Sequence, residues 1–286
     1  MLSVRRNGND RTDRRRFLTE SSVDQQQSER FGGTERLYGV DAVELYRHSH
    51  IAVIGVGGVG SWVAEALART AIGEVTLIDL DDVCVTNTNR QIHALSSTVG
   101  QSKVAVMADR MRDINPDCLV YEVEEFVSRD NLEALIHTEF DYVIDCIDSV
   151  GVKAALIHHC KRRKIPIITV GGAGGQVDPT RITIADLSRT EHDPLAAKLR
   201  NLLRRHYGFS KSGRRFAVDC VYSTEQLRYP QPDGSVCATK TLHDGQTRLD
   251  CSGGFGASTC VTASFGFVAV SRVLQKMYER YLRQNS

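Results

Sequence analysis

The chain has 286 residues, which is enough for one large α/β domain or two small ones. Its 36 Lys and Arg against 35 Asp and Glu give a net charge of +1, which excludes a global attraction to nucleic acid or membranes, so any such attraction must be local. Eight Cys without a C-x-x-C pair favour a reduced, cytoplasmic protein that has no structural zinc site.

The first 29 residues are rich in Arg, Ser and Gln and contain almost no apolar run. They lack the hydrophobic core of a secretory signal, so we expect them to form a disordered tail. The Arg residues between Arg5 and Arg16 could add nonspecific attraction to a polyanion.

Residues 51–90 predict a nucleotide site. An apolar run ends in G-x-G-x-x-G spacing through Gly55, Gly57 and Gly60, where a tight turn lets the backbone approach a phosphate. A helical pattern follows, and its free N–H groups would face the anion. A second apolar run then ends in Asp79, at the position expected of an acid that binds ribose.

Strands and helices continue to alternate along the chain. Apolar periodicity predicts helices over 100–114, 130–139 and 149–164, and strands over 118–127, 141–148 and 165–171. This alternation indicates an α/β fold with a doubly wound, Rossmann-like and mostly parallel sheet.

The pattern changes after residue 171. We expect a flexible crossing at GGAGG and Asp178-Pro179, a basic helix over 194–207, a strand over 215–222 and a long loop over 223–254. The apolar C-terminal stretch 253–274 is diluted by Gly, Ser and Thr, so a buried or dimer-interface helix is favoured over a membrane span.

Polar residues directly after Asp79 favour chemistry over simple cofactor binding. An NAD enzyme needs little beyond the ribose acid, whereas this chain has Asp81, Asn87, Asn89 and Arg90 in close succession. The glycines and Asp79 alone remain compatible with an NAD-dependent dehydrogenase, or with a noncatalytic adaptor that senses ATP.

The set Gly-x-Gly-Gly-x-Gly-Ser, Asp79-x-Asp81, Asn89-Arg90-Gln91, Lys103 and Asp145-x-x-Asp148 resembles the superfamily of ubiquitin-activating-type adenylating enzymes. Within it, the stretches RFGGTERLYG, TNTNRQIHAL, GGAGGQVDPT, DPLAAKLR and DGSVCATK are similar to the tRNA threonylcarbamoyladenosine dehydratase family. That resemblance implies ATP-dependent adenylation of a threonyl carboxylate beside the tRNA anticodon, followed by ring closure.

The resemblance also implies roles for residues. Asp148 would hold Mg²⁺, and Arg90, Lys103 and Asp148 would be catalytic. It further implies one ATP-binding domain over 30–286, with a nucleotide-binding core at 30–185 and a substrate and dimerisation region at 186–286. The ATP contacts would come from Gly55, Gly57, Gly58, Gly60, Asp79, Asp81, Asn87, Asn89, Arg90, Lys103 and, from the other subunit of a homodimer, Arg36.

Several of these residues have a structural alternative. Asp148 could cap the helix that begins at Ser149, and Lys103 could be a solvated residue in the first turn of a helix. Arg36 could be a surface arginine, and Arg30 competes with it for the intersubunit role.

Cys237 lies on the predicted long loop, where relatives that activate ubiquitin-like proteins could form a thioester. A loop cysteine with no catalytic role is an equal alternative, because intramolecular attack makes an enzyme nucleophile dispensable. Activation of a small ubiquitin-like sulfur carrier is the alternative function, and the absent C-x-x-C pairs argue against it. Cys84 and Cys146 are expected to be inert, in or beside core strands.

A tRNA substrate should leave a basic surface. Residues 194–218 contain no acid and seven cations, Lys198, Arg200, Arg204, Arg205, Lys211, Arg214 and Arg215, which we predict to bind tRNA phosphates. The basic run 161–164 suits the end of a helix and is expected to serve its dipole. A sulfur-transfer or cysteine-desulfurase-associated partner, and a monovalent cation near GGAGG or the C-terminus, are left open.

Overall fold

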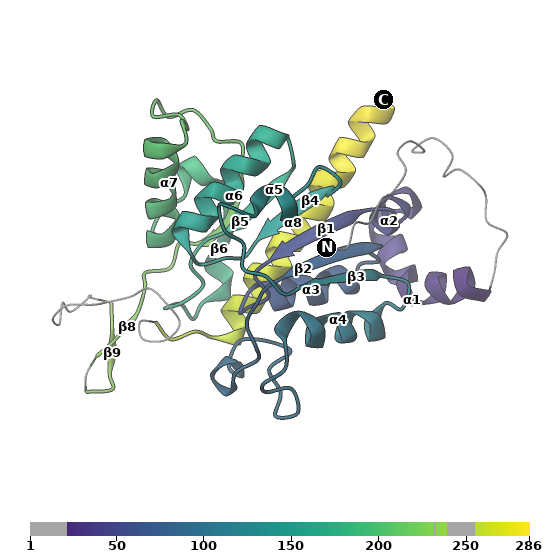
Figure 1. Ribbon diagram of the computed structural model, residues 1–286, viewed down its shortest axis with the longest axis horizontal. Coiled ribbons are helices and arrows are strands. Elements are labelled where there is room, and N and C mark those ends of the chain that lie inside the picture. Colours follow the sequence, from purple (N-terminus) through teal and green to yellow (C-terminus); the bar gives the residue numbers. More distant parts are fainter. Residues whose placement is uncertain (1–21, 232, 239–254) are drawn as a thin grey trace.

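The computed structural model describes residues 22–231, 233–238 and 255–286. Seven strands form one sheet in the order β3-β2-β1-β4-β5-β7-β6 (Figure 1). These strands are β1 (His50–Ile54), β2 (Glu74–Ile78), β3 (Leu119–Val123), β4 (Tyr142–Asp145), β5 (Ile167–Val170), β6 (Ile182–Asp186) and β7 (Asp219–Ser223). All neighbours are parallel except β6, which is antiparallel to β7 at the edge.

Helices cover both faces of this sheet, as predicted for a doubly wound fold (Figure 1). The helices are α1 (Ser22–Tyr38), α2 (Val40–Arg47), α3 (Gly60–Ala68), α4 (Lys103–Ile114), α5 (Leu132–Leu135), α6 (Val150–Arg163), α7 (Pro194–His206) and α8 (Thr259–Asn285). Three 3₁₀ turns, η1 (Val85–Asn87), η2 (Pro179–Arg181) and η3 (Leu187–Arg189), and a small hairpin of β8 (Tyr229–Pro230) and β9 (Val236–Cys237) complete the described elements.

The alternation of side chains along each strand divides the core into two layers. In β1, Ile51 and Val53 join the layer beneath α2, α3, α4 and α8, whereas Ala52 and Ile54 join the layer beneath α5, α6 and α7. A strand buried on both faces reads as a continuous apolar run, which is why the sequence predicts these strands well.

The C-terminal helix α8 packs against α3 (Figure 1). A Cβ on Gly266 would lie 3.0 Å from the Cβ of Trp62 and 3.0 Å from the carbonyl oxygen of Val59, so glycine is needed for this close approach. Phe265 and Val273 on α8 are fully buried. The expected buried helix is therefore present, and no helix in the described part of the chain is long and apolar enough to cross a membrane.

The predicted N-terminal tail extends too far. Helix α1 begins at Ser22, so residues 22–29 are helical, and residues 1–21 lie outside the described ranges. The prediction depended on hydrophobic periodicity, which is absent from the polar run SVDQQQSER. Gln, Glu and Arg nevertheless have high intrinsic helix propensity, which favours a helix over these residues.

The sequence also predicts too little structure after β5. The expected crossing contains the edge strand β6, and the expected strand over 215–222 begins only at Asp219. The helix predicted over 130–139 is the single turn α5. The hairpin β8–β9 occupies part of the predicted long loop, and residues 232 and 239–254 of that loop are not described.

Candidate active site

A cavity of about 880 Å³ opens at the carboxyl ends of β1, β2, β4 and β5. It lies where the strand order reverses between β1 and β4, which is where open α/β sheets bind their ligands. The wall includes most of the predicted nucleotide residues, namely Gly55, Gly57, Gly58, Asp79, Asp81, Asn87, Asn89, Arg90, Lys103 and Asp148. Gly60 lies behind this wall, at the first residue of α3.

The glycine-rich turn joins β1 to α3 with almost no space for side chains. Gly55 has φ of +85°, and a Cβ on Gly60 would lie 1.8 Å from the carbonyl oxygen of Gly55. Gly58 packs against the side chain of Arg90, whose Cδ would be 3.3 Å from an added Cβ. The turn thus presents bare backbone to the cavity at the N-terminus of a helix, an arrangement suited to phosphate groups.

Asp79 supports this turn from the end of β2. Its carboxylate accepts hydrogen bonds from the backbone N–H of Val56 at 2.7 Å and of Asp81 at 2.9 Å. A carboxylate has about four lone-pair sites, so Asp79 keeps the capacity to accept a ribose hydroxyl as well. The predicted ribose ligand is therefore also a structural brace for the glycine-rich turn.

Lys103 is buried, and only 7% of its side chain is exposed. Its ammonium lies 2.7 Å from a carboxylate oxygen of Asp81, whose side chain is 53% exposed. The alternative of a solvated lysine in the first turn of a helix is thus wrong, because this side chain points inward to the cavity wall. An ammonium held in this way provides a localised positive charge for an anionic ligand.

The polar turn 86–91 is tied to the start of α8. The side-chain amide of Asn89 donates to the carbonyl oxygen of Ala257 at 2.9 Å. Arg90 Nη1 donates to Asn89 Oδ1 at 3.0 Å and to the carbonyl oxygen of Thr86 at 2.8 Å. These bonds fix the guanidinium at the cavity wall, and its further N–H groups give it the capacity to bind an anion.

Asp148 is exposed at the cavity wall, in the turn between β4 and α6. Helix α6 begins at Val150 with Ser149 at its N-cap position, so Asp148 is not the cap of this helix. Mg²⁺ that arrives with a nucleotide needs only one or two protein carboxylates, since the phosphates supply other ligands. Asp148 fits that role, and the described residues hold no cluster of three or more metal-ligating side chains that would form a separate metal site.

A buried ion pair beneath this turn escaped the sequence analysis. Lys153 and Asp145 are both fully buried, and the ammonium lies 2.9 Å from the carboxylate. Lys153 also donates to the carbonyl oxygen of Ile147 at 2.8 Å, and Thr169 Oγ1 donates to Asp145 at 2.6 Å. The pair braces the turn that carries Asp148. Its signal in the sequence is a lysine within the otherwise apolar helix pattern VGVKAALI.

The opposite wall of the cavity comes from the segment after β5. Gly171, Gly172 and Gly174 line it together with Asp193, which precedes α7. The Asp193 carboxylate accepts from the backbone N–H of Gly172 and of Ala196, each at 2.9 Å. Burial raises the pKa of Asp193 above its ordinary value, although these hydrogen bonds oppose the shift.

His93 lies buried behind the glycine-rich turn, with 1% of its surface exposed. Its Nε2 lies 2.9 Å from the carbonyl oxygen of Val56, so this nitrogen carries the proton and donates. Burial, with a smaller contribution from the nearby Lys103 ammonium, lowers the pKa of His93 to about 4. The imidazole is thus neutral at physiological pH.

The cysteines differ from expectation at one position. Cys84 is exposed in the loop after β2, and hydrogen bonds from Thr86 lower the pKa of its thiol, so placing it in or beside a core strand was wrong. Its backbone N–H donates to the side chain of Asn87 at 3.0 Å.

Cys146 follows β4 as expected, and burial raises its pKa to about 12. Cys237 lies in β9 opposite Tyr229 and is not among the residues that line the cavity.

The basic segment 194–218 divides into two kinds of residue. Arg200 bonds to Thr190, and Arg204 lies over the Phe216 ring at 5.4 Å and donates to the carbonyl oxygen of Ser210, so these two are partly buried. The remaining cations are exposed, and they are Lys198, Arg205, Lys211, Arg214 and Arg215. The basic run 161–164 ends α6, as expected from the helix dipole.

Arg36 and Arg30 both lie on α1, and neither lines the cavity. Arg30 donates to the carbonyl oxygen of Ile114 at the end of α4 at 2.8 Å, which gives it a structural role within its own chain. Arg36 is exposed near Leu37 and Val40, whose exposed fractions are 75% and 70%. Of the two arginines, Arg36 is the one whose position suits contact with another molecule.

Comparison with known proteins gives consistent matches over most of the chain. The ThiF family model matches residues 33–282. The tRNA threonylcarbamoyladenosine dehydratase of Escherichia coli (strain K12) is 59% identical over 257 residues, which cover 90% of this chain and 96% of that protein. The dehydratase of Haemophilus influenzae is 52% identical and covers 88% of this chain and 94% of its own length.

A solved structure agrees with the fold. The crystal structure of E. coli tRNA N6-threonylcarbamoyladenosine dehydratase in complex with ATP superposes with a TM-score of 0.81 at 52% sequence identity. The match covers 93% of this chain and all of that one.

Proposed function

Because this chain belongs to the ThiF family, we propose that it is an ATP-dependent enzyme that dehydrates threonylcarbamoyladenosine in tRNA to a cyclic form. The observation that carries the proposal is the cavity at the switch point, whose wall combines bare glycine backbone with Arg90, Lys103 and Asp148. Similarity to two dehydratases over about nine tenths of the chain supports the substrate.

The proposed reaction has two steps. An oxygen of the threonyl carboxylate attacks the α-phosphorus of ATP, and pyrophosphate leaves. The carbamoyl group of the same substrate then attacks the activated carbonyl carbon, closes a five-membered ring, expels AMP and releases one proton. The oxygen formally lost as water leaves in AMP, so the sum is one ATP converted to AMP and pyrophosphate for each ring closed. Both reacting groups belong to one molecule, which makes the second step effectively unimolecular.

The residues of the cavity wall have separate roles in this proposal. The glycine-rich turn and the N-terminus of α3 hold the phosphates, Asp79 holds the ribose, and Asp81, Asn87 and Asn89 shape the pocket around them. Arg90 and Lys103 stabilise the negative charge that develops on the pyrophosphate as it leaves. Asp148 would hold Mg²⁺ that arrives with ATP, and that ion would neutralise further phosphate charge.

Exposed cations beside α7 support tRNA as the partner. Lys198, Arg205, Lys211, Arg214 and Arg215 have solvent-exposed side chains on a chain whose net charge is only +1. Such a local patch would contact tRNA phosphates without reading base identity. Arg200 and Arg204 contribute through the fold that presents the patch.

We further infer a homodimer in which Arg36 reaches the nucleotide site of the other subunit. The exposed Leu37 and Val40 beside Arg36 support an interface there, since large apolar side chains exposed together often mark association surfaces. Dimerisation, a cytoplasmic location, a monovalent cation and a sulfur-transfer partner each stay predictions. A thioester on Cys237 stays a prediction as well.

Mass spectrometry of tRNA nucleosides tests the function. We expect that the enzyme, ATP and Mg²⁺ convert threonylcarbamoyladenosine in tRNA to a product lighter by one water, with equal release of AMP. Formation of ADP, or an unchanged nucleoside, would contradict the proposal. Pyrophosphate exchange driven by a protein C-terminus instead of tRNA would favour the sulfur-carrier alternative, and tight NAD binding without ATP preference would favour a dehydrogenase.

A further inference from the structure

The second wall of the cavity is a loop whose shape cannot come from its own side chains. It follows β5 and reads GGAGG over 171–175. A Cβ on Gly171 would lie 1.8 Å from Asp193 Oδ2, and one on Gly175, where φ is +74°, would lie 2.9 Å from Phe255 Cδ1. The path of this loop therefore depends on hydrogen bonds that other segments make to its backbone.

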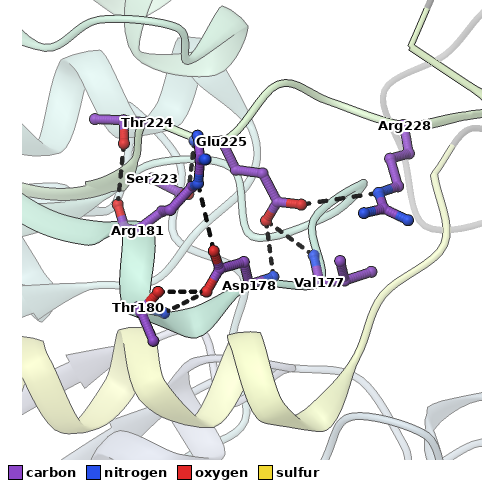
Figure 2. A network of polar contacts seen from close by, with 8 residues as sticks. All are labelled: Val177, Asp178, Thr180, Arg181, Ser223, Thr224, Glu225 and Arg228. Atoms are coloured by element: carbon purple, nitrogen blue, oxygen red, sulfur yellow. Dashed lines mark hydrogen bonds and ion pairs between the residues drawn. The ribbon is translucent and has the colours of Figure 1, made fainter.

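Two carboxylates hold the two ends of this loop. Asp193 accepts from the backbone N–H of Gly172 at 2.9 Å at the first end. At the second end, Glu225 Oε2 accepts from the backbone N–H of Val177 at 3.0 Å and of Asp178 at 2.8 Å (Figure 2). Asp193 lines the cavity, whereas Glu225 is not among its lining residues.

Glu225 is well placed to fix the loop. The residue is only 7% exposed, and its own backbone N–H donates to Ser223 Oγ at 3.1 Å, directly after β7. Burial of a carboxylate is costly unless hydrogen-bond donors compensate it, and here two backbone N–H groups and the Arg228 guanidinium at 3.8 Å do so (Figure 2). A buried charge with these partners binds the loop end to the sheet rather than to solvent.

The same segment contacts the loop at a second point. The backbone N–H of Arg228 donates to the carbonyl oxygen of Gly175 at 2.8 Å, and the backbone N–H of Gly175 donates to the carbonyl oxygen of Gly256 at 2.8 Å. Gly256 also lines the cavity, just before α8. Backbone hydrogen bonds thus join the loop to the segment after β7 and to the segment before α8. Glu225 holds the end of the loop that is farther from β5.

The rest of the polar network in Figure 2 acts locally. Asp178 accepts from the backbone N–H of Thr180 at 2.9 Å and forms an ion pair with Arg181 at 3.3 Å. The side chains of Arg181 and Asp178 are 57% and 39% exposed, so solvent screens this pair. Arg181 therefore provides a matched control, because it belongs to the same network but its side chain pairs with the exposed Asp178 carboxylate, and not with Glu225 or with the backbone N–H groups that Glu225 holds.

We propose that Glu225 is a positioning residue. It holds the loop 171–175 in place as the wall of the cavity against which the threonylcarbamoyl group of tRNA binds when it meets ATP. This inference rests on the proposed function. The nucleotide residues come from the β1, β2 and β4 ends, so the loop on the opposite wall, which lines the cavity beside Leu195 and Phe255, offers a surface for the carboxylate to be activated. Removal of the Glu225 carboxylate should therefore misplace the threonylcarbamoyl group and leave ATP binding intact.

The experiment compares Glu225→Ala with Glu225→Gln and the control Arg181→Gln in the full chain. For Glu225→Ala we expect the kcat for tRNA cyclisation to fall by at least about tenfold, since small displacements of reacting groups cost large factors in rate. Its Kd for ATP, measured by calorimetry, should stay within about twofold of wild type, because the phosphate-binding turn is held by other contacts. Glu225→Gln keeps an oxygen that accepts hydrogen bonds from the loop backbone, so it should retain most of the wild-type kcat. Arg181→Gln should have the kcat and the Kd for ATP of wild type.

The outcomes separate this inference from the proposed function. If wild-type enzyme cyclises no tRNA, the function itself is wrong. If wild type is active and Glu225→Ala is equally active, or loses ATP affinity by the same factor as kcat, Glu225 has no positioning role. Should Glu225→Ala fail to fold, Glu225→Asp decides the matter: its shorter side chain withdraws the carboxylate from the loop, and wild-type kcat in that variant overturns the proposal.

Discussion

The ammonium of Lys103 lies 2.7 Å from a carboxylate oxygen of Asp81, and the two residues differ sharply in exposure. The Lys103 side chain is 7% exposed, whereas that of Asp81 is 53% exposed. Water therefore stabilises Asp81 whether or not it is paired, while Lys103 depends on an anion at the cavity wall. In the proposed function, the phosphates of ATP would compete with Asp81 for the same ammonium, and the pair would hold Lys103 in place until the substrate arrives.

Lys103→Met should therefore impair activity much more than folding. Removal of one cation that stabilises developing charge typically costs about 10²-fold in kcat, and we expect a loss of that size in AMP release. The unfolding midpoint should change little, because the remaining Asp81 carboxylate is solvated. Lys276→Met on α8 removes a half-buried lysine whose ammonium lies 3.9 Å from Glu279, away from the cavity, and should leave both measurements nearly unchanged. A Lys103→Met enzyme with wild-type turnover would exclude Lys103 from phosphate binding.

The buried pair of Asp145 and Lys153 predicts a large stability effect. Removal of one member of a buried ion pair leaves an uncompensated charge and costs about 3–5 kcal/mol, so we expect Lys153→Met to lower the free energy of unfolding by that amount. The double variant Asp145→Asn, Lys153→Met removes both charges and should recover part of the loss. Urea unfolding measures both. A double variant less stable than Lys153→Met alone would show that the charges are not the main contribution.

His93 predicts a loss of stability in mild acid. Its pKa is about 4 in the folded chain, below the ordinary value of 6.5, so the unfolded state binds a proton more readily. Stability from neutral His93 is complete above pH 6.5 and is lost as pH falls toward 4, by about 3 kcal/mol over that interval. The effect acts on the nucleotide site because His93 donates to the carbonyl oxygen of Val56 in the glycine-rich turn.

His93→Gln should remove that component of the pH dependence. The glutamine amide can donate to Val56 and does not titrate, so the slope of unfolding free energy against pH between about 4.5 and 6.5 should fall by close to one proton. Urea titrations at several pH values give the slope. His206→Gln is a suitable control, since it removes an exposed histidine at the end of α7 that does not line the cavity, and it should leave the slope at its wild-type value. Equal slopes in wild type and His93→Gln would mean that another group controls acid stability.

The sequence was sufficient for the parallel strands of the sheet and for one wall of the cavity. Strands such as 51–54 are buried on both faces, and the glycine spacing and polar residues after Asp79 are local signals. Asp79, Lys103 and Asp148 lie far apart in the chain, and it was the resemblance to adenylating enzymes that predicted them together; the structure brings all three to the wall of one cavity.

The contacts that support the two walls of the cavity could not be predicted, because they are tertiary. Asp145 and Lys153 carry charges in positions that read as apolar core, and only their mutual distance of 2.9 Å explains them. Glu225 follows a strand like many surface glutamates, and nothing local indicates that its carboxylate holds Val177 and Asp178. Pairing between distant segments also made the edge strand β6 invisible, since its ladder to β7 spans a helix and a loop.

The basic segment after Pro194 provides the last prediction, because its cations divide by exposure. A double variant, Lys211→Gln with Arg214→Gln, removes two exposed charges. We expect it to bind tRNA more weakly, and we expect the slope of the logarithm of its association constant against the logarithm of salt concentration to be smaller in magnitude by about two. Arg204→Gln instead removes a guanidinium packed over Phe216 and should lower stability by about 1 kcal/mol, with a smaller effect on the salt slope. Filter binding across a salt series and thermal unfolding distinguish the two variants. Because phosphate contacts are independent of ATP, the Kd for ATP should not change in either. If the Lys211, Arg214 double variant binds tRNA with the wild-type salt slope, the tRNA contact lies on another face of the molecule.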